Sequence, residues 1–127
     1  MRLEFADEVE AARFWIYTCF DFIPWDLLAR GDNVSEHVVA LAPEDAELPT
    51  IFNYVLFPRN RLDEEWIREN AQLIHEKTGM IVVEDEELGV GLAIDGWGYD
   101  FARTHYLALY RLRGLRWHER TLTAFPV

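Results

Sequence analysis

Apolar and polar positions follow helical spacing most clearly between Asp63 and Thr78. At 100° per residue, one broad face collects Trp66, Ile67, Ala71, Leu73 and Ile74. The other side carries a narrow polar stripe made of Glu65, Glu69, Gln72 and Glu76. Asp63 is the expected N-cap, and Gly79 follows the last turn as a terminator. The pattern predicts one helix over 63–78 that buries its apolar face and shows carboxylates to water.

Two short apolar runs come next, at 80–83 and 90–94, and a charged turn ending in Gly89 joins them. This pattern predicts a β-hairpin. The turn holds four consecutive acids, Glu84, Asp85, Glu86 and Glu87.

A second helix is predicted from Asp100, as its cap, to about Arg113, with Gly114 as its terminator. Its expected apolar face consists of Phe101, Ala102, His105, Ala108, Leu109 and Leu112, with Tyr106 at the margin.

The N-terminal half is less regular. Residues 7–12 can begin a short helix, whereas 14–20 is rich in aromatic and β-branched residues, which favours a strand, although a buried helix would look similar. Residues 37–41 and 51–57 predict further strands, and 42–49, bracketed by prolines, predicts a loop. Together these elements predict a single α+β domain over residues 1–127, with a small antiparallel sheet and two main helices packed on it.

The net charge of the chain and its uneven distribution say the most about possible partners. The chain has 23 acids and 12 bases, for a formal charge of −11. Residues 1–100 carry −15, and the arginine-rich residues 101–127 carry +4. Such a protein repels nucleic acid and anionic membranes and attracts basic surfaces, so we expect neither direct nucleic-acid binding nor membrane binding. Solubility, with pairing of the C-terminal arginines to the acidic body, is the simpler interpretation.

Several kinds of chemistry lack support. Cys19 cannot form an internal disulfide and lies in an aromatic run, and Ser35 has no flanking glycines, so neither predicts a nucleophile. The four histidines are 13 or more residues apart, and no glycine-rich phosphate loop precedes Lys77, so we expect no metal and no cofactor.

No apolar run is long enough to cross a bilayer, and no leader-like segment opens the chain. We expect a cytoplasmic protein.

One cluster could support catalysis. Asp95, Tyr99, Asp100 and His105 surround a glycine loop, and a carboxylate–imidazole pair is chemically suited to acid–base catalysis. The simpler interpretation makes Asp100 a helix cap and His105 a core imidazole.

The acids form the other candidate site. Glu65, Glu69 and Glu76 share a helix face, and the four-acid turn is near in sequence, so they could form one negative surface that imitates a phosphate backbone. The candidate partner-binding residues are Glu65, Glu69, Glu76, Glu84, Asp85, Glu86 and Glu87.

The stretch from Gly96-Trp97-Gly98-Tyr99-Asp100-Phe101, through His105 and Leu109-Tyr110, to Gly114-Leu115 and Trp117-His118 resembles the C-terminal part of small uncharacterised proteins of phages and mobile elements. The resemblance covers about a fifth of the chain and carries over no catalytic residue. It implies a counter-defence role, such as inhibition of restriction or CRISPR systems.

These observations favour a non-enzymatic protein that docks its acidic face on a basic surface of a nucleic-acid-handling complex. Two alternatives stay open: a small enzyme that uses Asp100 and His105, and a homodimeric structural or assembly protein with exposed aromatics.

Overall fold

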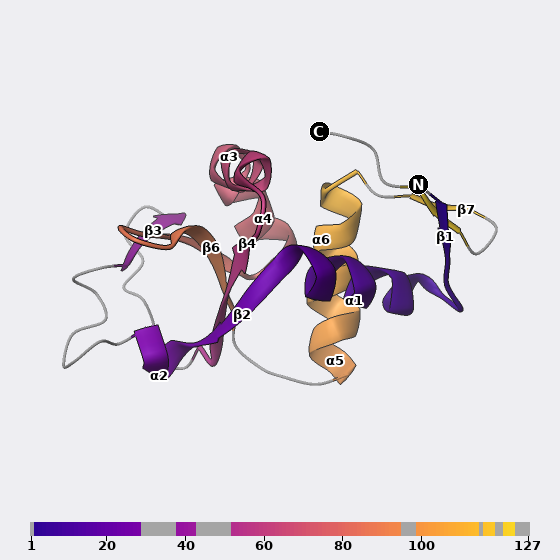
Figure 1. Cartoon of the computed structure of the whole chain (residues 1–127), viewed down its shortest axis with the longest axis horizontal. Helices are drawn as coiled ribbons and strands as arrows, with labels where there is room; N and C mark the ends of the chain where they lie inside the picture. The colour runs from indigo at the N-terminus through magenta and orange to yellow at the C-terminus, as the bar shows by residue number, and fades with distance from the viewer. Residues whose placement is uncertain are drawn as a thin grey trace.

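The chain forms an α+β fold built on a five-stranded antiparallel sheet, as the sequence predicts (Figure 1). The structure is a computed structural model that describes residues 2–28, 38–42, 52–94, 99–114, 116–118 and 121–123. The strands of this sheet are β2 (Phe20–Pro24), β3 (Val38–Ala42), β4 (Tyr54–Pro58), β5 (Ile81–Asp85) and β6 (Gly89–Ile94). They lie in the order β2-β4-β6-β5-β3. A smaller sheet joins β1 (Arg2–Glu4), β8 (Thr121–Thr123) and β7 (Arg116–His118).

Alternating side chains divide the large sheet into two apolar faces. Leu56, Val82 and Leu92 belong to a core shared with most of the helices, whereas Val55, Val83 and Ala93 belong to a second core on the opposite face. That second core also contains residues of the short helix α2 (Trp25–Leu28). Among the described residues, no helix has the length and apolar character needed to cross a bilayer.

Helix α1 (Glu8–Cys19) corrects the strand favoured for 14–20. Asp7 caps it, because the carboxylate of Asp7 accepts a hydrogen bond from the Glu10 amide at 2.8 Å. The buried residues Ala11, Ala12, Trp15 and Ile16 recur with helical spacing. This spacing and the cap outweigh the strand preference of the aromatic run, and β2 begins only at Phe20.

The helix predicted over 63–78 is two helices, α3 (Arg61–Glu69) and α4 (Ala71–Thr78). Asn60, rather than Asp63, is the N-cap of α3, and its side chain accepts a hydrogen bond from the Leu62 amide. Gly79 ends α4 with a left-handed φ of 76°, as predicted. Leu73 is 39% exposed instead of buried, because the buried face is narrower than predicted and is centred on Ile67, Ala71 and Ile74.

The last helical segment contains a π-helical turn, Ala102–Tyr106, between α5 (Tyr99–Phe101) and α6 (Leu107–Leu112). Asp100 lies inside its first turn rather than at the cap. The wider turn rotates the buried face by about 100° relative to an α-helix, so Tyr106 and Tyr110 are buried and His105 is half-buried. The predicted face is therefore wrong in part.

The predicted hairpin is present. Strands β5 and β6 pair antiparallel, with Glu84 opposite Val90. At the edge of the sheet β3 pairs with β5, and its register shifts between Ala40 and Ala42, which marks a bulge.

Candidate functional site

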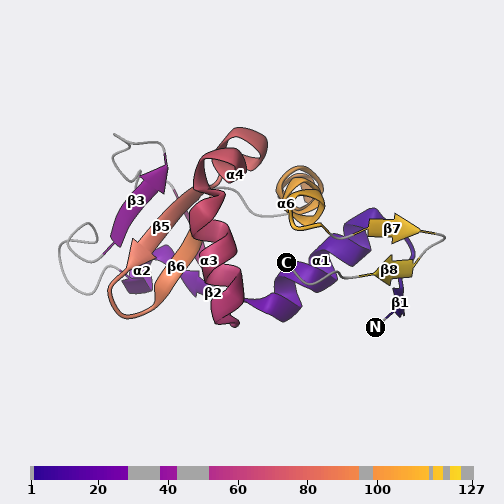
Figure 2. The same ribbon diagram turned by 90° about the horizontal axis from the view of Figure 1, so that it is seen from above.

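Helix α3 and the β5–β6 hairpin form the most negative part of the described molecule. Residues 60–90 contain nine acids and three bases, so this segment alone carries −6 of the total charge of −11. Figure 2 shows α3 lying along the hairpin. Carboxylates that are distant in sequence are thereby placed on neighbouring elements.

Two polar contacts join α3 to the hairpin. The Glu64 Oε1 atom accepts a hydrogen bond from the Val90 amide at 3.0 Å, and Arg68 Nη2 donates to Glu84 Oε1 at 2.6 Å. Glu64 and Arg68 are four residues apart, so one face of α3 makes both contacts. Glu84 and Val90 are directly opposite each other in the hairpin. These contacts fix how the exposed carboxylates of the helix lie relative to those of the turn.

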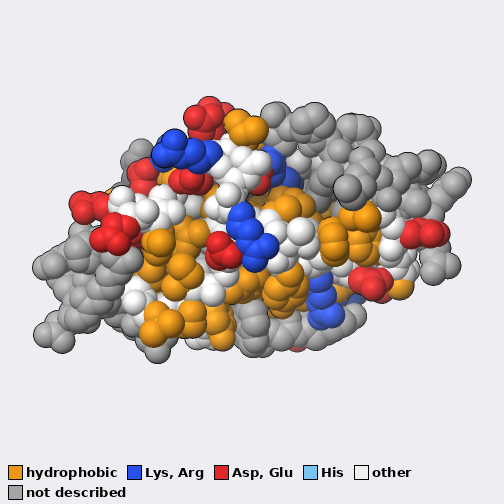
Figure 3. All heavy atoms as spheres, in the orientation of Figure 1, with side chains coloured by type: hydrophobic (Ala, Val, Ile, Leu, Met, Phe, Trp, Pro, Cys, Tyr) orange, Lys and Arg blue, Asp and Glu red, His pale blue; other side chains and the backbone are white. Residues whose placement is uncertain are grey.

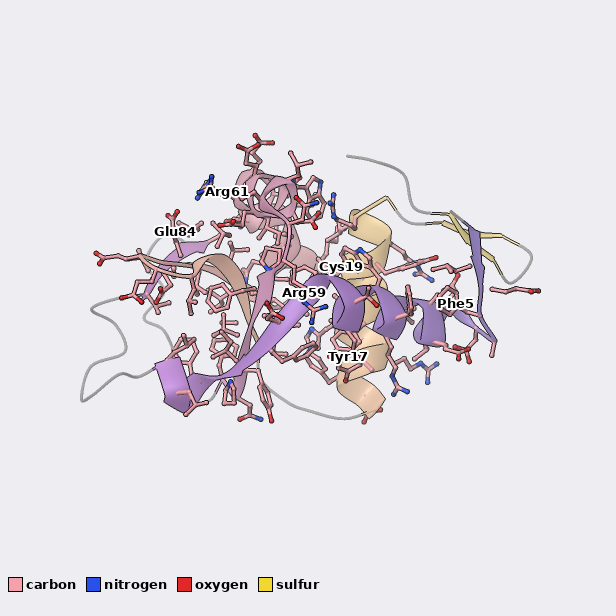
Figure 4. The ribbon with its side chains drawn as sticks, viewed as in Figure 1. Phe5, Tyr17, Cys19, Arg59, Arg61 and Glu84 are labelled. Carbon is pink, nitrogen blue, oxygen red and sulfur yellow. The ribbon has the colours of Figure 1, made fainter. Side chains whose placement is uncertain are left out.

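Five of the seven predicted binding residues are exposed: Glu65, Glu69, Glu76, Glu86 and Glu87. We call these five residues the acidic surface. Figure 3 shows acidic side chains gathered over α3 and the hairpin, with the cation of Arg61, labelled in Figure 4, among them.

Asp85 and Glu84 require a correction. Asp85 is only 3% exposed, and its Oδ1 atom accepts hydrogen bonds from the amides of Glu87 and Leu88, at 2.8 and 2.9 Å. It therefore holds the turn together and is not available to a partner. Glu84 is half-buried and already paired with Arg68. The sequence could not separate these roles because all four acids of the turn look alike.

Arg68 makes the charge of this region mixed. The hydrogen bond that Arg68 donates to Glu84, together with the charges of Glu84, Glu64 and Glu65, raises the pKa of Arg68 above its ordinary value. The guanidinium therefore stays charged and offsets part of the negative potential around it.

The C-terminal arginines pair with other acids. Arg111 contacts Glu8 at 2.8 Å, and Arg113 forms an ion pair with Asp63. Arg113 also lies over the Trp66 ring, 5.0 Å from its centroid. The expected pairing of this segment with the acidic body is confirmed for these two arginines, whose partners Glu8 and Asp63 are not part of the acidic surface.

The structure gives the Asp100–His105 pair little support. Asp100 is exposed, whereas the half-buried His105 ring lies 4.9 Å from that of Phe101. A cavity of about 340 Å³ between α4 and α6 is lined, in the described part of the chain, by Lys77, Ala108, Arg111 and Leu112. Neither Asp100 nor His105 is among these residues. Asp95 and the side chain of Tyr99 lie outside the described residues, as does Ser35.

No set of three His, Cys, Asp or Glu side chains within the described ranges is arranged to hold a metal ion. Burial raises the pKa of the Cys19 thiol, against the smaller opposing effects of Arg113 and Arg59. A raised pKa disfavours the thiolate, so Cys19 is poorly suited to nucleophilic chemistry.

An aromatic strip on α1 and its flanks was not predicted as a continuous feature. We define it as Phe5, Phe14, Tyr17 and Phe22. The Phe5 and Phe14 centroids are 5.2 Å apart, and Tyr17 stacks on Phe22 at 4.9 Å. Phe14 and Tyr17 are three residues apart and share the solvent side only if the segment is helical, so the strand interpretation hid this surface.

No protein-family model, curated protein or solved structure matches this chain.

Proposed function

We propose that the protein is a non-enzymatic binding protein whose acidic surface docks on a basic surface of a nucleic-acid-handling complex and blocks it. The contact works by charge complementarity, and the body of the domain then excludes the nucleic acid from the occupied groove. Association of this kind is fast and weakens as salt is added.

The observation that carries this proposal is the attachment of α3 to the hairpin. Because Glu64 binds Val90 and Arg68 binds Glu84, the two elements behave as one unit. Glu65 and Glu69 on the helix and Glu86 and Glu87 in the turn are then held in place before a partner arrives. Prior ordering of this kind reduces the entropy lost on binding.

A basic partner fits better than nucleic acid or an anionic membrane. Exposed glutamates of α3 and the hairpin outnumber the exposed arginines by four to two, and the −11 charge of the chain repels polyanions at long range. Arg61 and Arg68 within the same region favour partners whose own acids lie opposite these cations. Such a mixed pattern supports selectivity among basic proteins.

The test reverses two exposed acids on α3, Glu65→Lys and Glu69→Lys. The matched control reverses two exposed acids elsewhere, Glu4→Lys and Asp100→Lys, so that both variants change the net charge equally. Each protein is used to capture partners from the native host at low and high ionic strength. We expect the unchanged protein and the control to capture a basic nucleic-acid-binding complex at low salt, and the α3 variant to lose it.

Duplex DNA added as a competitor should release the captured complex, because both ligands would occupy the same basic groove. Equal capture by the two variants would contradict the proposal, and so would capture that DNA does not affect. Circular dichroism of both variants checks that the fold is retained.

A further inference from the structure

The solvent side of α1 carries an aromatic surface made of two ring pairs, Phe5 with Phe14 and Tyr17 with Phe22. Phe14 is 41% exposed and Tyr17 is 48% exposed, although both are large apolar or amphipathic side chains. Ring contacts extend this surface to Phe5 at one end and Phe22 at the other, and Tyr106 supports Tyr17 edge-on from below at 5.9 Å. Figure 4 shows Phe5 beside the N-terminal end of α1 and Tyr17 near its other end. Exposed apolar patches of this kind mark interaction sites.

The two ends of this surface carry opposite charges. Glu10 is exposed near the start of α1, in line with Phe14 and Tyr17. Arg59 lies at the other end, where its Nη1 donates to the Thr18 carbonyl at 2.7 Å and its backbone amide donates to the Cys19 carbonyl at 2.9 Å. The Arg59 side chain is 53% exposed, although it also binds Asp21.

We infer that the aromatic strip is the interface of a two-fold homodimer. A second copy would lay its α1 antiparallel on the first, with Phe14 of each copy on Tyr17 of the other. In that arrangement Glu10 of each copy meets Arg59 of the other. Glu10 and Cys19 are about 14 Å apart along the helix at 1.5 Å per residue, so the two charged ends lie on either side of an axis between Phe14 and Tyr17. A surface that is complementary to itself in this way is what a two-fold contact requires.

Electrostatics also favour a second copy at this place. Two molecules with a charge of −11 repel each other, and the repulsion is smallest where the facing surfaces are locally neutral. Beside Phe14, Tyr17 and Phe22 the charges balance, since Glu10 and Asp21 are matched by Arg13 and Arg59, whereas Glu4 and Asp7 add negative charge beside Phe5. The acidic surface belongs to α3, α4 and the hairpin turn, and these elements lie away from the N-terminal part of α1 (Figure 1). A dimer through α1 therefore keeps the acidic surfaces apart.

Sedimentation equilibrium over a wide range of concentrations tests this interface. The variant is Phe14→Glu, and the matched control is Leu73→Glu, an exposed apolar residue on α4 whose exposure of 39% is close to that of Phe14. We expect the unchanged protein and the control to form a dimer and no larger oligomer. Phe14→Glu should raise the dimer dissociation constant about 30-fold or more, as is usual for a central aromatic residue.

A charge exchange tests the geometry. Glu10→Lys and Arg59→Glu should each weaken self-association, because like charges then meet at both ends of the strip. An equimolar mixture of the two variants should recover a heterodimer. In that heterodimer the lysine introduced into one copy faces the glutamate introduced into the other, and the unchanged Glu10 and Arg59 meet at the opposite end. Thermal melts monitored by circular dichroism check that both variants are folded, because Arg59→Glu also loses its contacts to Asp21 and Thr18, and Glu10→Lys loses the hydrogen bond that Glu10 accepts from the Ala6 amide.

Three outcomes would overturn the inference: a monomer at all concentrations up to the millimolar range, an unaffected dimer in Phe14→Glu, or no recovery in the mixture of folded variants. None of these outcomes tests the proposed function of the acidic surface, which is tested by partner capture alone.

Discussion

Asp63 and Arg113 form an ion pair between the first turn of α3 and the end of α6, and each side chain is only 12% exposed. Burial lowers the pKa of Arg113 from its ordinary value, yet this guanidinium remains protonated near neutral pH. Its Nη1 atom is buried without a hydrogen-bond partner among the described residues. The ion pair with Asp63 and the contact with the Trp66 ring therefore offset most of the free energy that burying the Arg113 charge costs.

Asp63→Asn should lower the free energy of unfolding by about 3 kcal/mol, because the substitution leaves the charge of Arg113 buried and uncompensated. Urea denaturation monitored by circular dichroism measures this loss. Arg111→Gln is the control, since it breaks the exposed pair with Glu8 and should cost less than about 1 kcal/mol. A similar decrease in the free energy of unfolding of the two variants would show that burial adds nothing to the contribution of the Asp63–Arg113 pair.

The buried phenols of Tyr106 and Tyr110 predict how stability depends on alkaline pH. Burial raises the pKa of Tyr110 to about 12, with a smaller contribution from Glu8, and burial raises that of Tyr106 further still. The folded state therefore holds these protons more tightly than the unfolded chain, whose tyrosines titrate near pH 10. Their contribution to stability is complete below about pH 10 and is lost as the pH rises toward 12 and beyond.

Ultraviolet absorbance of tyrosinate during an alkaline titration checks this expectation. The Tyr106 and Tyr110 signals should appear only as the protein unfolds, and Tyr106→Phe should delay unfolding to higher pH. Reversible ionisation of all five tyrosines near pH 10 in the folded protein would contradict it.

At the scale of elements, the junction of α3 with the hairpin depends on a glycine. Gly89 has a φ of 88°, and a Cβ atom placed there would clash with Glu64 Oε1. Glu64 would have to turn away and give up its hydrogen bond to Val90. Gly114 has a similar φ of 81°, but apart from its chain neighbours no described residue has a heavy atom within 4 Å of such a Cβ, which makes it a matched control.

We expect Gly114→Ala to cost about 1 kcal/mol from backbone strain alone, and Gly89→Ala to cost about 2–3 kcal/mol because a charge-assisted hydrogen bond is also lost. Chemical denaturation measures both values. In a Glu64→Ala background the two glycine substitutions should become equally costly. A persisting difference would mean that something other than Glu64 occupies the space beside Gly89.

The elements that the sequence predicted best are those with local stop signals. The hairpin and the end of α4 at Gly79 follow from charged turns and glycines, which act within a few residues. The second half of α1 was predicted as a strand, with a buried helix left open, because its aromatic residues suit either structure. Burial by the sheet and α6 decides between them. The break at Asn70 and the π-helical turn leave no signal in the spacing of apolar residues, so a periodicity analysis does not predict them.

At the scale of the whole molecule, the α1 dimer and the acidic surface would act together. Each dimer would present two acidic surfaces, so a partner with two basic sites, or a partner complex with repeated subunits, would be bound twice. Phe14→Glu should then weaken binding to a bivalent target far more than binding to a monovalent fragment of the same target. Surface plasmon resonance at high and low density of the immobilised partner compares the two cases, and equal affinities at both densities would argue for independent monomers.

The candidate site was predictable only in outline. Charge counting located the acidic region, and exposure of Glu65, Glu69, Glu76, Glu86 and Glu87 agrees with it. Counting could not show that Asp85 stabilises its own turn, because that role depends on backbone amides that converge only in the folded hairpin.

The bulge in β3 affects the tendency of the protein to aggregate at high concentration. In the described part of the chain β3 is an outer strand, and its register shift between Ala40 and Ala42 interrupts the regular row of amides and carbonyls that another chain would need as a template. An apolar border strand such as Val-Val-Ala-Leu-Ala would otherwise invite fibril growth. Deletion of one alanine should straighten β3, and we expect this variant, unlike the unchanged protein, to form thioflavin-positive aggregates on storage.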